Sequence, residues 1–434
     1  MTGVDAGLAQ RVRGEVTRAL VATIGQTARG SGARVDAGRR LVADSLERYA
    51  KECLSDGKPV LDPAVEDAIS TSVMNSLFGL AGFQRYLDDP MVEDIYVNGH
   101  NCVWIRCAGG RMEPGDPVAG SDAELIDILR EIGARGGMTE NRFDPGAPDL
   151  DLDLPDGSRL FAVMAVSRRP SVTIRCHRLL DVTLDELVER GTIDYGLREL
   201  LGALVRARRN IIVSGGASVG KTTLIRALAN EIPPDERVVT IEDPRELHLD
   251  LFPDRHPNVV SLEVRKPNVE GVGRVTASDL VRWSLRMSPD RVIVGEVRGD
   301  EVVPMLNAMG EGKDGSMCTV HANASSHAFD KLWTYAAQAP ERLSAEATSQ
   351  LIASTVHIVV HVVRVGELRA VSSVREVVGA NERQVISNEI YKPGPGRIAT
   401  PSGVPLQERT LQDLVDIGFD PAVLEGRALR SAWA

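Results

Sequence analysis

A glycine-rich segment, Gly215 to Thr222, could bind phosphate. Its order, Gly-Gly-Ala-Ser-Val-Gly-Lys-Thr, fits the pattern GxxxxGK[ST]. Glycines let backbone N–H groups turn inward as an anion-binding nest, and the amino end of a following helix adds partial positive charge. Lys221 would reach the β- and γ-phosphates, and the Thr222 hydroxyl would ligate Mg²⁺. We therefore expect ATP and Mg²⁺ to bind here, at residues Gly215, Gly216, Ala217, Ser218, Val219, Gly220, Lys221, Thr222 and Thr223.

Two acidic segments could supply the carboxylates that a phosphate site needs for hydrolysis. The segment Glu242-Asp243-Pro244-Arg245-Glu246 follows the apolar stretch 237–241, and Glu296 ends the apolar stretch 291–295. Ligands of parallel sheets bind at the carboxyl ends of strands. A carboxylate there can hold Mg²⁺ or orient an attacking water. A lone acid at a strand end is commonly a cap or a surface charge, but two of them beside a phosphate loop favour a nucleotide-hydrolysing site.

His321 and two lysines are further candidates for contacts with phosphate. His321 follows the apolar stretch 316–320, where a histidine either packs and caps or senses a γ-phosphate, and the residues alone leave both interpretations open. The chain carries 7 Lys against 43 Arg, so a lysine at a particular place invites a reason. Lys221 has one in the phosphate loop. Lys313 is either a surface residue or a second cation near phosphate.

The elements that must position these residues alternate between strands and helices from residue 197 to about 365. Apolar, β-branched stretches at 210–214, 237–241, 291–295, 316–320 and 356–363 are separated, in several cases, by helical segments. Continuous apolar strands of this kind predict a mostly parallel sheet covered on both faces. From residue 367 onward we expect a short hairpin, a Pro/Gly-rich loop and a final helix.

The amino-terminal part has a different texture. Residues 8–53 and 63–82 have helical apolar spacing, and short β-rich runs at 94–99, 102–107, 158–166 and 171–175 surround a helix near 121–133. We therefore predict five parts: a helical segment (1–77), an α/β domain (78–180), a linker (181–196), a nucleotide-binding core (197–375) and a carboxyl-terminal extension (376–434).

Composition excludes several classes of protein. The chain has 434 residues and is 43% apolar, which is typical of a folded protein of about two to three domains. A net charge of −11 argues against a global basic field for nucleic acid. No signal peptide or membrane-spanning apolar run is visible, and five scattered cysteines favour reduced thiols. Seven arginines between 11 and 40 form either a solvated helix face or a patch for acidic lipid or a partner.

The ordered motifs resemble those of a known superfamily. GGASVGKTT, VVTIEDPRELHL, RMSPDRVIVGEVRG and DGSMCTVHAN resemble the Walker A, Asp box, Walker B and His box of the type II/IV secretion ATPases. LDDPMVEDIYVNGHNCVWIR, DLDLPDGSRLFAV, SVTIRCHR, REVVGANERQVISNEIY and LVDIGFDP make the chain look most like the tight-adherence (Flp) pilus assembly ATPases. The similarity covers roughly residues 78–425. It implies an α/β fold with a RecA-like P-loop core after a smaller α/β domain.

The resemblance also implies roles for individual residues. Glu246 would be the catalytic base, Glu296 the Walker B acid acting on Mg²⁺ or water, and His321 a neighbour of the γ-phosphate. Arg159 and Arg175 would reach the phosphates from the amino-terminal domain, because the arginine fork matches phosphate oxygens. Members form hexameric rings on the cytoplasmic face of the membrane and drive a polytopic membrane platform that assembles a pilus or moves a substrate. We therefore expect a cytoplasmic, peripherally attached homo-hexamer that binds no nucleic acid.

The sequence departs from the family pattern in three places, and two related functions stay open. Ala217, Ser218 and Val219 stand where the loop usually reads Thr-Gly-Ser, Lys313 replaces the first His of the His box, and Cys176 interrupts a usually more basic run. These departures concern the hydrolysis rate rather than the fold. The alternatives to a pilus motor are a type IV secretion or conjugation ATPase and a nucleotide-gated scaffold with little turnover. A small-molecule kinase or a DNA helicase fits the boxes and the charge less well.

Overall fold

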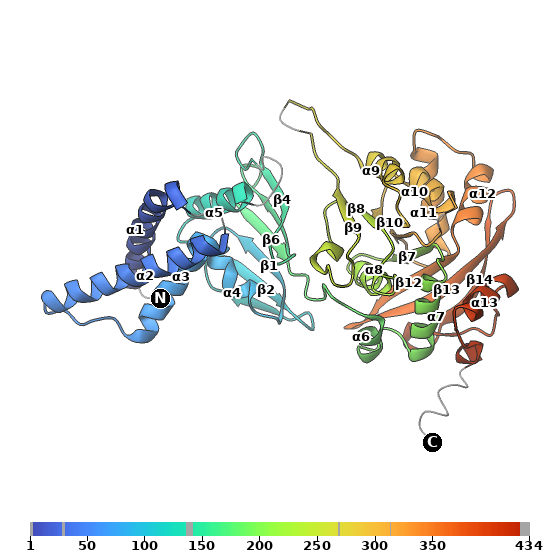
Figure 1. Ribbon diagram of the computed structural model, residues 1–434, viewed down its shortest axis with the longest axis horizontal. Helices are drawn as coiled ribbons and strands as arrows, with labels where there is room; N and C mark the ends of the chain where they lie inside the picture. The colour runs from blue at the N-terminus through green and yellow to red at the C-terminus, as the bar shows by residue number, and fades with distance from the viewer. Residues whose placement is uncertain (1–2, 28–30, 136–141, 268–269, 313, 426–434) are drawn as a thin grey trace, which may run out of the picture. The chain divides into compact units, whose positions relative to one another are not determined.

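The phosphate loop and both acidic segments fall within the second of two units of the chain. The computed structural model describes residues 3–27, 31–135, 142–267, 270–312 and 314–425. It divides into the units Met1–Arg178 and Leu179–Ala434 (Figure 1). The finer five-part division remains a prediction. Among the described residues, no helix combines the length and apolar character that crossing a membrane requires.

The first unit joins three long helices to an antiparallel sheet. Its elements are α1 (Gly3–Thr27), α2 (Ser31–Ser55), α3 (Pro63–Phe78), η1 (Ala81–Phe83), α4 (Gln84–Leu87), β1 (Val92–Asn98), β2 (Val103–Cys107), β3 (Met112–Gly115), α5 (Asp122–Arg135), β4 (Asp149–Asp153), β5 (Arg159–Val163) and β6 (Ser171–Arg175). The strand order is β3-β2-β1-β6-β5-β4. Val12, Val42 and Ile69 belong to the core of the three helices, and Leu125 and Leu129 of α5 belong to that of the sheet.

The second unit is built on one nine-stranded sheet. Its elements are α6 (Leu184–Glu189), α7 (Tyr195–Arg206), β7 (Ile211–Gly215), α8 (Lys221–Ala229), β8 (Val238–Glu242), η2 (Leu249–Leu251), β9 (Val259–Glu263), α9 (Ala277–Ser284), η3 (Leu285–Met287), β10 (Arg291–Val297), α10 (Val302–Gly310), β11 (Met317–His321), α11 (His327–Gln338), α12 (Ala345–Thr355), β12 (Ile358–Val365), β13 (Leu368–Ala380), β14 (Val385–Pro393), η4 (Pro395–Arg397), β15 (Ala399–Pro401), α13 (Glu408–Asp416) and η5 (Pro421–Glu425).

The strands of this sheet run in the order β15-β14-β13-β12-β7-β11-β10-β8-β9. The six from β12 to β9 are mutually parallel, and β13 to β15 continue antiparallel. Alternate residues serve two cores: Ile211 and Val213 pack with α7 and α8, whereas Ile212 packs with α9 to α12. The predicted α/β fold, with a mostly parallel sheet covered on both faces, is therefore confirmed.

Four strands were absent from the sequence prediction: β3, β4, β9 and β15, the last of which lies in the predicted Pro/Gly-rich loop. β4 reads Asp-Leu-Asp-Leu-Asp, and aspartate is depleted in strands, although Leu150 and Leu152 alternate inward as a half-buried strand requires. β3 contains both Pro and Gly and lies at a sheet edge. β9 is an edge strand of the nine-stranded sheet in the second unit, and its residues are only partly buried.

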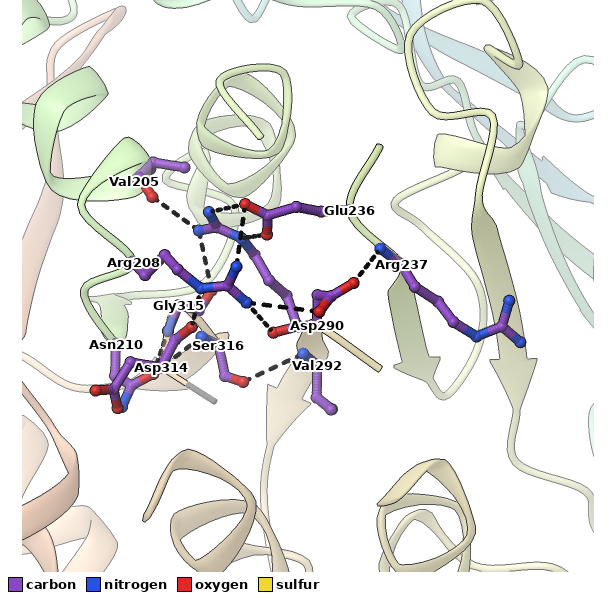
Figure 2. Close-up of polar contacts among 11 residues, drawn as sticks. Val205, Arg208, Asn210, Glu236, Arg237, Asp290, Val292, Asp314, Gly315 and Ser316 are labelled. Atoms are coloured by element: carbon purple, nitrogen blue, oxygen red, sulfur yellow. Dashed lines mark hydrogen bonds and ion pairs between the residues drawn. The ribbon is translucent and has the colours of Figure 1, made fainter. Parts of the chain in front are cut away.

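A buried polar cluster holds the amino ends of the central strands (Figure 2). The side chain of Arg291, at the start of β10, is fully buried; it pairs with Glu236 through two bonds of 2.6 and 3.0 Å and donates to the Val205 carbonyl at 2.8 Å. A Cβ at Gly315 would lie 2.8 Å from Arg291 Nη1, which explains a glycine there. Asn210, just before β7, accepts the N–H groups of Gly315 and Ser316, just before β11. The cluster thus fixes β7, β10 and β11 against one another.

Removal of the Arg291 guanidinium is expected to lower the free energy of unfolding by about 3–5 kcal/mol, because Glu236 is left buried without its main partner. Urea unfolding of Arg291→Met measures this. Arg291→Met combined with Glu236→Leu is expected to recover most of the loss, since an apolar pair can replace a buried ion pair. Arg282→Met, which breaks an exposed pair with Glu341, serves as the control and should cost less than about 1 kcal/mol. Equal losses in the two single variants would contradict this role of the cluster.

Candidate nucleotide site

The phosphate loop connects β7 to α8, the strand–loop–helix arrangement that the motif requires. A Cβ at Gly215 would lie 2.5 Å from the Val362 carbonyl, so the first loop position needs glycine. The N-cap of α8 is Gly220, with φ +97° and no side-chain acceptor, in contrast to the capping side chains of Thr183, Asp194 and Thr276 on neighbouring helices. The amino end of α8 therefore presents backbone N–H groups that no cap occupies, as anion binding needs.

Ser218 adopts the left-handed conformation, with φ +57°. This is the loop position where the family pattern has glycine, and a non-glycine residue pays roughly 1–2 kcal/mol to enter this region. The departure at Ser218 therefore leaves the loop geometry in place, at an energetic cost.

Lys221, His321 and Glu296 form a continuous chain of contacts. Lys221 is 7% exposed, donates to the Gly216 carbonyl at 2.8 Å, and lies 3.4 Å from both ring nitrogens of His321. His321 Nε2 lies 2.5 Å from Glu296 Oε1, and Arg298 Nε lies 3.5 Å from Glu296 Oε2. Burial lowers the pKa of Lys221 and, together with the Lys221 charge, that of His321. The structure thus places His321 between the loop lysine and the acid of β10.

Glu246 lies beside the residue predicted to bind Mg²⁺. Thr222 Oγ1 donates to Glu246 Oε2 at 3.2 Å. The carboxyl of Glu242, at the end of β8, turns toward the same segment, and its Oε1 accepts the N–H groups of Glu246 at 2.9 Å and Leu247 at 2.8 Å. Lys221, Thr222, Glu246, Glu296 and His321 therefore all lie within one unit, at the carboxyl edge of its parallel strands.

Glu242 is an unusual carboxyl group because it is 3% exposed. Burial raises its pKa to about 8, against the two backbone hydrogen bonds that lower it. It is therefore held protonated at neutral pH.

Arg159 and Arg175 lie in the first unit, where they face each other directly across β5 and β6. Arg159 pairs with Asp151 through two bonds of 3.1 Å. Arg175 Nε lies 3.4 Å from Asp94, which Arg106 also approaches at 3.4 Å. The structure brings the two arginines together on one sheet, and their approach to phosphate stays a prediction.

A cavity of about 290 Å³ adjoins the loop inside the second unit. Leucine and valine side chains form the apolar part of its wall, and arginine, threonine and glutamate side chains form the polar part. Arg369 Nε donates to the Ser218 carbonyl at 3.4 Å. The cavity is lined by Leu179, Leu187, Arg190, Thr192, Val219, Gly220, Thr223, Leu224, Val362, Glu367, Leu368 and Arg369. A mixed surface of this size next to a phosphate loop suits a planar heterocyclic base.

Sequence reasoning missed several residues of this region. Arg298 joins the site through Glu296 and through the Asp243 carbonyl at 2.7 Å, and its position two residues beyond the Walker B acid was an available signal. Leu179, Leu187 and Arg369 come from segments with no motif, so only the fold brings them to the loop.

The remaining sequence hypotheses have mixed outcomes. Lys313 lies outside the described residues. Of the seven amino-terminal arginines, Arg11 pairs with Glu52 at 3.7 Å and Arg13 with Glu131 at 3.5 Å, so part of the basic patch is neutralised within its own unit. Arg29 is not described, and Arg39 and Arg40 are exposed. All five cysteines are free thiols.

Comparison with known proteins places these motifs in context. A family model described as "Type II/IV secretion system protein" matches residues 80–393. A putative conjugal transfer protein of Mycobacterium tuberculosis is 34% identical over 303 residues, which is 67% of this chain and 82% of that protein. Protein VirB11 of Agrobacterium fabrum is 32% identical over 308 residues, covering 64% of this chain and 86% of its own length.

A solved structure is also similar: the VirB11 ATPase of the Brucella suis type IV secretion system, in complex with sulphate. It is 28% identical, covers 68% of this chain and 95% of its own, and gives a TM-score of 0.37. The Mycobacterium and Agrobacterium relatives are named for conjugal transfer and as VirB11. Neither name refers to a tight-adherence pilus, so these relatives do not support the predicted closeness to that branch.

Ser218→Val is expected to weaken ATP binding at least about tenfold, because a β-branched residue resists the left-handed conformation that the loop needs. Ser218→Gly should keep full affinity. Titration of a fluorescent ATP analogue measures both. Ser288→Val is the control, since Ser288 also has a positive φ (+52°) but ends η3, outside the phosphate loop. It should lower the melting temperature without changing affinity, and equal affinity for Ser218→Val and Ser218→Gly would contradict the argument.

Glu242→Gln is expected to flatten the pH dependence of stability between about pH 4.5 and 8. In that range the folded state keeps a proton that the unfolded state releases, so the stability of the unmodified chain falls as pH rises through it. The total effect is on the order of a few kcal/mol. Urea unfolding at several pH values measures it, with Glu408→Gln, an exposed acid, as the control. An unchanged slope in Glu242→Gln would show that Glu242 is ionised in the folded state.

Proposed function

The chain belongs to the type II/IV secretion system protein family, whose members hydrolyse ATP, and we propose that it powers a type IV secretion or conjugation machine. The observation that carries the proposal is the contact chain from Lys221 through His321 to Glu296, next to the Thr222–Glu246 pair. This arrangement joins a phosphate cradle to two carboxylates, which suits hydrolysis. Relatives named for conjugal transfer and for type IV secretion support the machine that the ATPase serves.

The nucleotide would lie along the loop with its phosphates over residues 215–222. Lys221 would shift from the Gly216 carbonyl and His321 to the β- and γ-phosphates, since an ammonium group prefers an anion to a neutral acceptor. The base would enter the cavity beside the loop, between Leu187 and Arg369. Binding in this pose occupies the backbone N–H groups at the amino end of α8.

Hydrolysis requires a group that orients and deprotonates water near the γ-phosphate. Glu246 is the proposed base, because its carboxylate already lies at the Thr222 hydroxyl. Glu296 would hold the second side of the site, with His321 fixing its orientation. Within the described residues, no three His, Cys, Asp or Glu side chains cluster as a protein-only metal cage. Mg²⁺ suits this donor set, because it is usually bound by one or two protein groups together with substrate phosphates.

When bound to Thr222, Glu296 and ATP, Mg²⁺ would neutralise charge that develops on the phosphate oxygens. Arg159 and Arg175 are the proposed additional cations for those oxygens. The working form is proposed to be a homo-hexamer that acts on polytopic inner-membrane platform proteins. It would be cytoplasmic and peripheral on the inner face of the cytoplasmic membrane.

A tight-adherence pilus assembly motor is the second candidate. The motifs at 87–106 and 151–163 favour it, because they resemble that branch outside the shared ATPase boxes. The chemistry would be identical and only the partner would differ. A scaffold with little turnover is not retained, since the family hydrolyses ATP.

Lys221→Ala is expected to abolish ATP binding, and Glu296→Ala to keep binding while lowering kcat at least about a hundredfold. Phosphate release by the purified chain with Mg²⁺, across protein concentrations, measures turnover and its dependence on assembly. Lys392→Ala removes an exposed lysine of β14 and is the control. Full turnover in Lys221→Ala would overturn the site assignment.

The secretion or conjugation ATPase and the pilus motor can be distinguished by deleting this gene in cells of the source organism. Loss of DNA or protein transfer, with surface pili intact, supports the secretion or conjugation ATPase. Loss of pili with transfer intact supports the pilus motor. Complementation with Lys221→Ala should fail in either case.

A further inference from the structure

Arg226 lies on α8, one turn after the phosphate loop, and no motif assigns it a role. It is 3% exposed. One guanidinium nitrogen, Nη1, donates to the Leu179 carbonyl at 2.6 Å, and the other, Nη2, donates to the Glu246 carbonyl. The side chain therefore spans from the first residue of the second unit to the proposed base.

The backbone of Glu246 is held from its other side as well. Its N–H donates to the buried carboxyl of Glu242 at 2.9 Å, while its carbonyl accepts from Arg226. Both peptide groups that flank the Glu246 Cα are thus fixed by buried, ionisable side chains. With the Cα fixed, few rotamers remain by which the carboxylate can meet the Thr222 hydroxyl.

Burial of the charged Arg226 side chain costs desolvation free energy. Burial lowers its pKa to about 10, although the nearby carboxyl groups of Glu246 and Glu242 act in the opposite direction, and no salt bridge to Arg226 is present among the described residues. An apolar residue of similar volume is often neutral or stabilising in place of a buried charge. The contacts of Arg226 are directed at two carbonyls, one of them that of the proposed base, which indicates a role in placing that residue.

Leu179 adds a second connection. Its carbonyl accepts from Arg226, and the same residue lines the cavity assigned to the base of the nucleotide. Asn230, which caps the carboxyl end of α8, donates to the Val182 carbonyl at 2.7 Å and so also holds this segment, without a hydrogen bond to Glu246. Arg226 therefore connects Leu179, at the start of the second unit, to Glu246, the proposed catalytic base.

We propose that Arg226 is a positioning residue for ATP hydrolysis: by holding the carbonyl groups of Leu179 and Glu246 together, it places the Glu246 carboxylate to deprotonate the water that attacks the γ-phosphate. The proposal rests on the proposed ATPase function and on Glu246 as the base. It makes the chemical step, rather than nucleotide affinity, depend on Arg226.

A double-mutant cycle tests the role. Arg226→Met, Glu246→Gln and the double variant are compared in the full-length chain for kcat at saturating ATP, for affinity with a fluorescent nucleotide, and for melting temperature. We expect Arg226→Met to lower kcat at least about tenfold and to change affinity less than about threefold. In the Glu246→Gln background the same change should lower kcat less than about twofold, because Arg226 acts through Glu246.

Two further variants guard against a purely structural explanation. Asn230→Ala loses a contact to the same segment and should keep wild-type kcat, while Arg226→Lys should give a kcat below wild type, because one ammonium group cannot match the two-carbonyl fork. Arg226→Lys provides the comparison if Arg226→Met does not fold.

Several results would overturn the proposal. They are wild-type kcat in Arg226→Lys, an equal loss in Asn230→Ala, or effects of Arg226→Met and Glu246→Gln that multiply. Absence of turnover in the unmodified chain would contradict the proposed function itself. Undiminished kcat in Arg226→Met contradicts only the role of Arg226.

Discussion

The site depends on one constraint: four adjacent strands run parallel and in register. Gly215 of β7 pairs with His321 of β11, Val320 pairs with Val297 of β10, and β10 in turn pairs with β8. Because parallel strands end at the same edge, the phosphate loop, His321, Glu296 and the Glu242–Glu246 segment must meet there. Side chains separated by up to a hundred residues therefore come within hydrogen-bond distance without any local sequence signal for the contact.

The pairing of these strands is fixed at their amino ends. Arg291 begins β10, Asn210 precedes β7, and Ser316 precedes β11, and all three belong to one buried polar cluster. A short strand whose amino end is fixed has little freedom at its carboxyl end, because it is only five to seven residues long. The cluster costs desolvation energy, and in return it selects one strand alignment over its slipped alternatives.

The sequence was sufficient for the features that arise locally. The phosphate loop, its flanking strand and helix, and the presence of a mostly parallel sheet follow from glycine spacing and from continuous apolar stretches separated by helices. The contacts of Arg226 with Leu179 and Glu246 could not be predicted. Both acceptors are backbone carbonyl groups, which every residue has, so the sequence carries no signal for them. The edge strands β3, β4 and β9 were missed since their residues lack strand propensity or continuous burial. The predicted closeness to the pilus branch came from motifs outside the ATPase boxes, and the relatives found carry conjugal transfer and VirB11 names instead.

Arg159 and Arg175, the cations proposed for the phosphate oxygens, are held in the first unit by weak ion pairs. Two like charges directly across a strand pair repel, and the carboxylates of Asp151 and Asp94 offset that repulsion. Both arginine side chains are about a third to a half exposed, and ion pairs in such surroundings are worth roughly 0–1 kcal/mol. Exchange of an aspartate for a phosphate oxygen would therefore cost little and gain a bidentate contact. The same weakness would let each arginine return to its aspartate after phosphate leaves, which suits a group that must act once per catalytic cycle.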